Sequence, residues 1–154
     1  MAGKELNEII IDNMLISDLQ EVVAIEKASF TKPWSETLFY KEIHNHRSVA
    51  KVARIDKKVA GYVCANLIID EGHILDLAVH PEFRRLGIAS RLVAHAIDFL
   101  KSGGCRIIFL EVRSSNGIAR RMYEKFGFKV IGIRKNYYVL PVEDAIIMSL
   151  EFEK

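Results

Sequence analysis

The stretch Arg84-Arg85-Leu86-Gly87-Ile88-Ala89-Ser90 begins a helix with residues that an isolated helix would not favour. Apolar residues at helical spacing follow it and Gly103-Gly104 ends the pattern, so we predict a helix over residues 88–102. The first turn of a helix exposes unpaired N–H groups and a partial positive charge, which favour Asp, Glu, Ser or Thr. Here two arginines and a glycine stand instead, with no capping side chain before Ser90. Because an anion would neutralise both the arginines and the helix start, the stretch indicates a phosphate site.

The alternative for this stretch is a pair of solvated arginines beside a tight turn. Residues 74–79 are predicted to form a strand that leads through His80-Pro81 into the turn. Open α/β sheets bind ligands at the carboxyl ends of their strands, which favours the phosphate site. A P-loop or a dinucleotide-binding glycine pattern would suit such a site, but the sequence contains neither.

Length and composition limit the class of protein. With 154 residues, half of them apolar and 27% charged, the chain suits a single domain over residues 1–154. The formal net charge of +2 is too small to favour nucleic acid as the main partner. The first eight residues lack an apolar signal core and no apolar run could span a bilayer, so we expect no membrane partner and a cytoplasmic location. Cys64 and Cys105 lie in strand-like runs and are expected to be reduced, packed thiols.

Apolar periodicity predicts an α/β (α+β) fold, a mixed seven-stranded sheet with helices on both faces and with its fourth and fifth strands parallel. Ser17 and Gln20 have the spacing of a capping box for the first helix, and Ser35 is expected to cap the second. Gly72 is expected to end a strand pair, and residues 134–144 are expected to form a loop. The strands are predicted at residues 9–15, 48–55, 59–69, 74–79, 105–113, 128–133 and 145–152, and the helices at 17–29, 35–45, 88–102 and 116–126.

Several motifs occur in a fixed order along the chain. Arg84-x-x-Gly87-x-Ala89 follows Leu77-Ala78-Val79-His80-Pro81, and segments 111–116, 122–128, 136–138 and 143–148 come after it. With these and residues 30–35, the chain resembles the GNAT superfamily of acyl-CoA-dependent N-acyltransferases over most of its length. It is most similar to the RimI-type ribosomal-protein-alanine acetyltransferases and to the related archaeal and eukaryotic N-terminal acetyltransferase subunits.

This resemblance implies that acetyl-CoA lies between the splayed fourth and fifth strands. The backbone of Leu77, Ala78 and Val79 would pair with the pantetheine arm and thioester, and Asn116 would hydrogen-bond that arm. Leu77 and Val79 are also expected to be core residues, and Asn116 is expected to cap a helix. The resemblance places the pyrophosphate on the turn formed by Arg84, Arg85, Leu86, Gly87, Ile88, Ala89 and Ser90. No metal is implied, and the histidines lack ligand partners at a suitable spacing.

Glu111 interrupts an apolar run that predicts a strand buried on both faces. Burial there should raise the pKa of its carboxyl. One interpretation is a structural ion pair with Arg113 or another cation. The resemblance implies instead the general base for an N-terminal amine, whose pKa is about 8.

Tyr123 has two interpretations as well. Its spacing from Ala119 and Phe126 is that of an aromatic core residue on a helix. The resemblance implies that it also binds the cofactor and acts as the general acid that protonates the CoA thiolate.

Two aromatic segments remain to receive the acceptor. The resemblance implies that Phe30, Pro33 and Trp34 in one loop and Tyr137 and Tyr138 in another cover the first residues of a substrate protein. Trp34 also suits a hydrophobic staple with Phe39 around the Ser35 cap.

The implied reaction is acetyl transfer from acetyl-CoA to the α-amino group of a protein N-terminus, by direct attack in a ternary complex. A ribosomal protein is a candidate substrate, and an auxiliary subunit is a candidate partner. The alternatives are acetylation of lysine side chains or small amines, and a non-catalytic acyl-CoA binding module.

Overall fold

The computed structural model describes residues 8–152. The expectation that the first eight residues lack a signal core therefore concerns residues that lie mostly outside the described range. Its strands form one mixed sheet of seven strands, as predicted, and their order in the sheet is β1-β2-β3-β4-β5-β7-β6. The strands are β1 (Ile10–Asn13), β2 (Ser48–Ile55), β3 (Lys58–Ile68), β4 (Glu71–Val79), β5 (Ile107–Arg113), β6 (Lys129–Val139) and β7 (Val142–Glu151). The helices are α1 (Leu19–Ser29), α2 (Glu36–His44), α3 (Ile88–Ser102) and α4 (Gly117–Lys125), with short 3-10 turns at Ile16–Asp18 and Pro81–Phe83.

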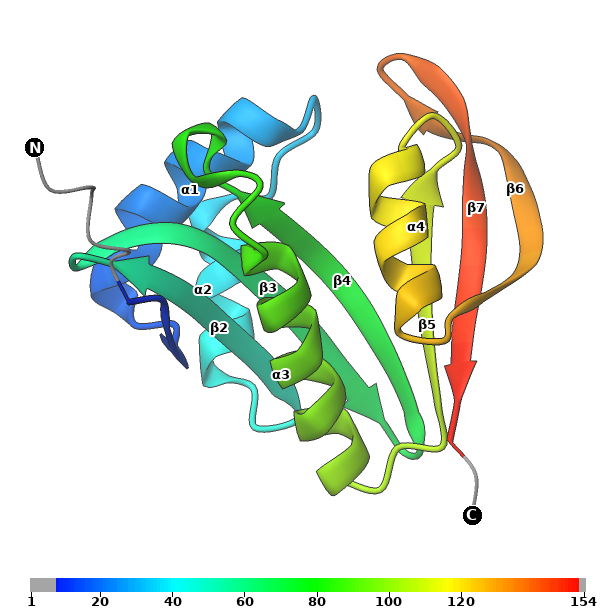
Figure 1. Ribbon diagram of the computed structural model, residues 1–154, viewed down its shortest axis with the longest axis horizontal. Coiled ribbons are helices and arrows are strands. Elements are labelled where there is room, and N and C mark those ends of the chain that lie inside the picture. Colours follow the sequence, from blue (N-terminus) through cyan, green and yellow to red (C-terminus); the bar gives the residue numbers. More distant parts are fainter. Residues whose placement is uncertain (1–7, 153–154) are drawn as a thin grey trace, which may run out of the picture.

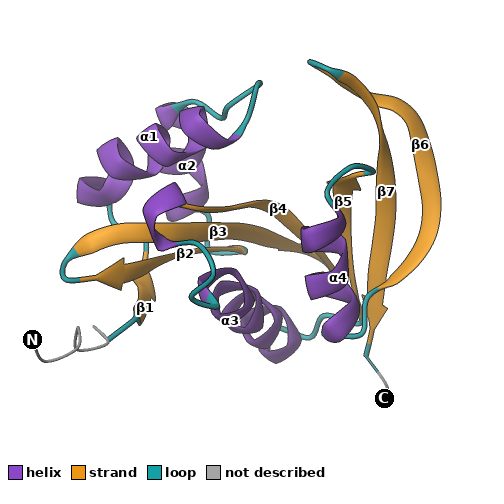
Figure 2. Ribbon diagram, turned by 45° about the horizontal axis from the view of Figure 1, so that its top comes forward, coloured by secondary structure: helices purple, strands orange, loops and turns teal. Residues whose placement is uncertain are grey.

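Helices cover both faces of the sheet, as the alternation of elements predicted (Figure 2). On one face, α1 and α2 pack through Leu19, Val22 and Phe39 against Tyr62 of β3. On the other face, α3 supplies Leu92 and its apolar neighbours, and α4 supplies Tyr123, to a second core. Both cores form because each helix carries an apolar stripe at helical spacing.

The parallel strands β4 and β5 pair over only three residues each, Glu71–His73 with Ile107–Phe109. Beyond this pairing the two strands diverge (Figure 1). The register of β4 against β3 shifts between Ile74 and Asp76, so Leu75 is an extra residue of β4. Because such a bulge bends a strand and increases its twist, it accounts for the divergence that was predicted.

The start of α1 differs from the prediction, because a 3-10 turn precedes it and Ser17 does not cap it. Asp18 instead accepts a hydrogen bond from the Leu15 N–H at 2.8 Å and pairs with Arg54. A buried acid with its own cation, and not Ser17, thus stands directly before α1. The cap at the second helix is confirmed, since Leu38 N–H donates to Ser35 Oγ at 3.3 Å.

The loop predicted at residues 134–144 is instead the tip of a long hairpin formed by β6 and β7. Only Leu140 and Pro141 lie between the two strands. The pairing is irregular between Arg134 and Tyr138, where Asn136 has a φ of 53°. An edge strand that is exposed along most of its length lacks the apolar alternation used to recognise strands, which explains the error.

Gly72 does not end a strand, because it lies inside β4 and pairs with Leu67 and Ile108. The preceding turn is made without glycine, since Ile69 itself takes a φ of 58°. A methyl group on Gly72 would lie 2.9 Å from Leu100 Cδ1 and 3.0 Å from Cys105 Sγ. The position therefore requires glycine because α3 packs closely on the strand.

We expect Gly72→Val to lower the free energy of unfolding by about 1–3 kcal/mol, the usual effect of overpacking a core. The matched control is Gly132→Val in β6, where an added methyl group would meet no atom of residues 8–152 within 4 Å. Urea denaturation of both variants measures the difference. Equal stability of the two variants would show that α3 does not constrain Gly72.

Candidate active site

A cleft of about 590 Å³ opens where β4 and β5 diverge. It is lined by the end of α1 and the following loop, by β4 and β5, by α4 and by the β6–β7 hairpin. Eight of the predicted site residues line it, namely Phe30, Trp34, Leu77, Glu111, Asn116, Tyr123, Tyr137 and Tyr138. Pro33, Ala78, Val79 and the turn before α3 are not among the lining residues. The fold thus gathers both candidate catalytic residues and most of the candidate acceptor residues, which are far apart in sequence, around one space.

The turn before α3 is open and includes left-handed backbone. Arg85 and Gly87 have φ angles of 66° and 76°, and no side chain caps the helix that Gly87 precedes. A methyl group on Gly87 would meet no atom of the described residues within 4 Å, so the space above it is open. Ile88 is fully buried in the core, which leaves only its backbone for a ligand.

Glu111 lies between two donors on the cleft wall. Its Oε2 is 2.8 Å from His73 Nε2, and its Oε1 accepts a hydrogen bond from Tyr137 OH at 3.4 Å. The hydrogen bond from His73 lowers the pKa of Glu111, and partial burial opposes this effect only in part. The prediction of a raised pKa is therefore wrong.

The error at Glu111 has a geometric cause. Buried and half-buried residues alternate along β5, and the Glu111 side chain is 18% exposed on the half-buried side. The strand is thus not buried on both faces as predicted. Of the cations suggested as a partner, Arg113 is excluded because it binds Glu143, whereas His73 lies at ion-pair distance from Glu111.

Tyr123 is buried and packs edge-on against Phe128, with ring centroids 5.5 Å apart. The core packing suggested by its helical spacing is confirmed. Burial, followed by the charge of Asp76, raises the pKa of Tyr123, so the phenol stays protonated at neutral pH. The predicted cap is also confirmed, since Asn116 Oδ1 accepts the Ala119 N–H at 3.1 Å.

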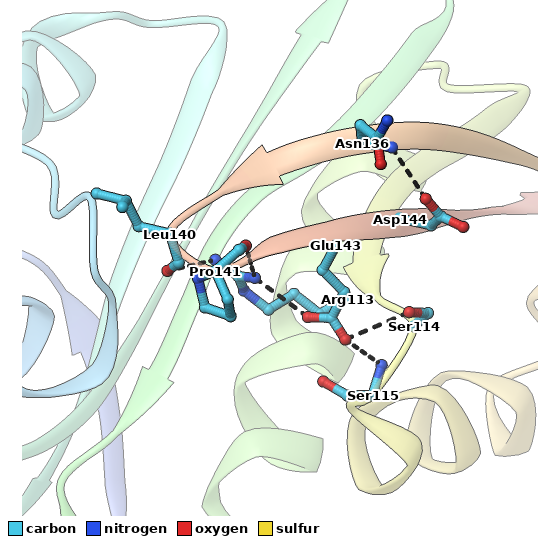
Figure 3. A network of polar contacts seen from close by, with 8 residues as sticks. All are labelled: Arg113, Ser114, Ser115, Asn136, Leu140, Pro141, Glu143 and Asp144. Atoms are coloured by element: carbon cyan, nitrogen blue, oxygen red, sulfur yellow. Dashed lines mark hydrogen bonds and ion pairs between the residues drawn. The ribbon is translucent and has the colours of Figure 1, made fainter.

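A polar network holds the tip of the β6–β7 hairpin beside the cleft (Figure 3). Arg113 at the end of β5 donates to Glu143 Oε1 at 3.1 Å and to the Pro141 carbonyl at 3.2 Å. Glu143 Oε2 accepts the Ser115 N–H at 2.8 Å. These contacts lower the pKa of Glu143 to about 2. The Ser115 hydroxyl has the largest effect, and the Arg113 guanidinium follows it.

Tyr137 and Tyr138 therefore lie on a strand of this tethered hairpin and not in a free loop. Their rings meet edge-on with centroids 5.1 Å apart, and the Arg113 guanidinium lies 4.2 Å from the Tyr138 ring centroid. Tyr137 remains 41% exposed, so part of its ring is open to solvent. Trp34 and Phe39 have ring centroids 5.2 Å apart, which confirms the expected staple.

Three polar residues near the cleft were not predicted as site residues: Glu26, His73 and Asp76. Glu26 occupies a buried position of α1 one turn after Val22. Because acids are seldom buried without a partner, a carboxylate on the apolar stripe of a helix could have marked it as a candidate site residue. His73 gave no such signal, because its partner Glu111 lies 38 residues away and meets it only through the parallel pairing of β4 with β5.

The remaining expectations concern metals, thiols and membranes. Within residues 8–152 no group of three or more His, Cys, Asp or Glu side chains could hold a metal ion. Cys64 and Cys105 are both free and buried. None of the helices in the same range has the length and apolarity needed to cross a membrane.

The chain is similar to known acetyltransferases in both sequence and structure. The sequence profile of the Acetyltransferase (GNAT) family matches residues 19–128, more than half of the chain. The [ribosomal protein bS18]-alanine N-acetyltransferase of Salmonella typhimurium is 36% identical, over 87% of this chain and 91% of its own. The crystal structure of the Escherichia coli ribosomal-protein-S18-alanine N-acetyltransferase superposes with a TM-score of 0.86 at 33% identity, covering 96% of each chain. Arabidopsis thaliana NAA60 in complex with acetyl-CoA shares the fold at 20% identity, with a TM-score of 0.85 over 94% of this chain and 100% of its own.

Proposed function

The chain belongs to the GNAT acetyltransferase family, and from this premise we propose that it transfers acetyl groups from acetyl-CoA to the α-amino group of protein N-termini. The single observation that carries the proposal is the cleft between β4 and β5, which has the Glu111 carboxylate on one wall and the Tyr123 phenol on another. The relatives named for acetylation of a ribosomal-protein alanine support a protein N-terminus as the acceptor. We propose one catalytic domain over residues 1–154, acting in the cytoplasm.

The residues at the end of β4 and the start of α3 fit acetyl-CoA. Pairing with β5 stops at His73, so the later backbone of β4, including Leu77, Ala78 and Val79, is free on that side to pair with a pantetheine arm. The uncapped start of α3 and the open space over Gly87 suit a pyrophosphate held by the N–H groups of the turn 84–90. Asn116, at the start of α4, lies where it can bond the same arm.

Acetyl-CoA supplies the activated acyl group, and the chemistry left to the protein is the movement of two protons. A new N–C bond forms as the C–S bond breaks, while one proton leaves the amine and one reaches the sulfur. We assign the first proton to Glu111, directly or through a water, and the second to Tyr123. Since the N–H groups become more acidic as the nitrogen attacks, a carboxylate with a lowered pKa can still accept the proton.

The acceptor would enter between two aromatic walls. Phe30, Pro33 and Trp34 belong to the loop after α1, and Tyr137 and Tyr138 belong to the hairpin on the other side. A peptide held between them would bring its N-terminus to Glu111, because Tyr137 OH already contacts that carboxylate. An auxiliary subunit would direct the substrate choice without adding to this catalytic set.

The test is acetylation of matched peptides whose N-terminus is free or chemically blocked, each carrying one internal lysine. We expect turnover only with the free N-terminus, and mass spectrometry locates the acetyl group. Exclusive acetylation of the lysine would refute the proposal in favour of lysine as the acceptor. Binding of acetyl-CoA without turnover on either peptide would indicate a non-catalytic acyl-CoA binding module.

A further inference from the structure

Two carboxyl groups lie buried together where the cleft meets α1. Glu26 of α1 is 1% exposed and Asp76 of β4 is 7% exposed, and both line the cleft. Neither residue has a role in the proton transfers assigned above. Burial of two acids at one place is unfavourable unless their charge is reduced or paired, so the pair requires an explanation.

Both carboxylate oxygens of Glu26 accept hydrogen bonds from other parts of the protein. Its Oε1 accepts the Tyr62 hydroxyl at 2.7 Å, and its Oε2 accepts the backbone N–H of Trp34 at 2.9 Å. Trp34 belongs to the acceptor loop, here residues 30–34, which follows α1 and lines the cleft. Glu26 thus fixes one end of the acceptor loop to the interior of the protein.

Asp76 is the protonated member. Its Oδ2 is buried and has no hydrogen-bond donor among the described residues. Burial, followed by the neighbouring carboxyl of Glu26, raises the pKa of Asp76 to about 9. A proton held between the two carboxyls satisfies the otherwise unpaired oxygen and removes one of two like charges.

Among residues 8–152, no cation forms an ion pair with either acid. The titratable groups that interact with the pair are Tyr62 and Cys64 of β3 and Tyr123 of α4, while Glu42 of α2 acts on Cys64. All of these groups are neutral or negative. Loss of the proton would therefore leave two adjacent buried charges that repel each other.

Asp76 lies directly before Leu77, in the stretch of β4 that we assign to the cofactor, whereas Glu26 holds Trp34 of the acceptor loop. We propose that Glu26 and Asp76 form a proton-sharing link that positions the acceptor loop against the cofactor strand, with Asp76 as a positioning residue. The expected effect on the peptide KM rests on the proposed function. The link itself can be observed by fluorescence, without turnover.

Trp34 is the only tryptophan of the chain, so its fluorescence reports directly on the acceptor loop. In the wild type we expect the emission to shift to longer wavelength as the pH rises through about 9, where Asp76 loses its proton. In Asp76→Asn the side-chain amide donates to Glu26 at every pH, so this shift should be absent. The same pH response in both proteins would overturn the proposal, because tyrosine ionisation and other alkaline effects are common to both.

Kinetics provide the second readout. Asp76→Val removes the donor, and loss of a hydrogen bond to a charged group should raise the peptide KM about tenfold. Acetyl-CoA affinity should stay within about twofold of wild type, and Asp76→Asn should restore the peptide KM. Equal loss of peptide and acetyl-CoA binding in a folded Asp76→Val protein would show a merely structural role. A wild type that acetylates no peptide would refute the proposed function, while the fluorescence comparison would still decide whether the link exists.

Discussion

Glu111→Gln should lower kcat by about 10²–10⁴-fold, the usual contribution of a general base, and should leave acetyl-CoA affinity nearly unchanged. The substitution keeps the size of the side chain and its contacts with His73 and Tyr137 but removes the negative charge and the proton acceptor. The cofactor would be held by the backbone of β4 and α3, which the substitution does not touch. Steady-state kinetics with a free N-terminal peptide and titration with acetyl-CoA measure the two effects separately.

The matched control is Glu124→Gln, the same change at an exposed position of α4 whose charge meets only Arg120 at 4.0 Å among the ion pairs of residues 8–152. Its kinetics should equal those of the wild type. If Glu111→Gln also left kcat unchanged, Glu111 would lose its role as base. Its contacts with His73 and Tyr137 would then have to be structural.

The lowered pKa of Glu111 has a consequence for the pH profile. The carboxyl stays ionised until the pH falls below its ordinary value of 4.5, so its titration does not limit the rate near neutrality. The acidic limb should follow the substrate amine, whose pKa is about 8. Because folding lowers the pKa of Glu111, its ionised carboxylate stabilises the folded protein. This contribution to the free energy of unfolding is present above the unfolded pKa and is lost as the pH falls through the folded pKa.

Local chemistry allowed most of the fold to be predicted. The bounds of α3 follow from an apolar stripe and a glycine pair, and the parallel strands follow from the right-handed crossover that a helix between two strands requires. Gly72 shows where this reasoning ends, since its need for glycine comes from Leu100, a neighbour in space. The extension of β6 also depends on pairing with β7, because its own residues are mostly exposed and carry no strand pattern.

The site could be predicted only where a resemblance or a local pattern marked it. Glu111 was found because it interrupts an apolar run, but its pKa shift was predicted in the wrong direction, since His73 could not be placed beside it from sequence. The Glu26–Asp76 pair was missed for the same reason, because the two acids lie on different elements that only tertiary packing brings together.

Gly87→Val should weaken CoA binding by at least about 100-fold, because two or more hydrogen bonds from backbone N–H groups to a charged phosphate would be lost. Gly87 has a φ of 76°, and the space over it contains no atom of residues 8–152 within 4 Å. A branched side chain would fill the space that we assign to the pyrophosphate. It would also strain the left-handed backbone, which costs about 1–2 kcal/mol. Calorimetric titration with CoA and thermal unfolding of the same samples measure both effects.

The two causes can be separated within the same helix. Gly104, just beyond the other end of α3, has a φ of 91° and is also free of neighbours within 4 Å among the described residues. Gly104→Val should therefore have a similar loss of stability while binding CoA as the wild type does. If both variants bound CoA equally weakly, the effect would come from strain in α3, and tight binding by Gly87→Val would refute the phosphate site itself. Only the loss of binding in Gly87→Val alone agrees with a helix start whose missing cap is replaced by the ligand.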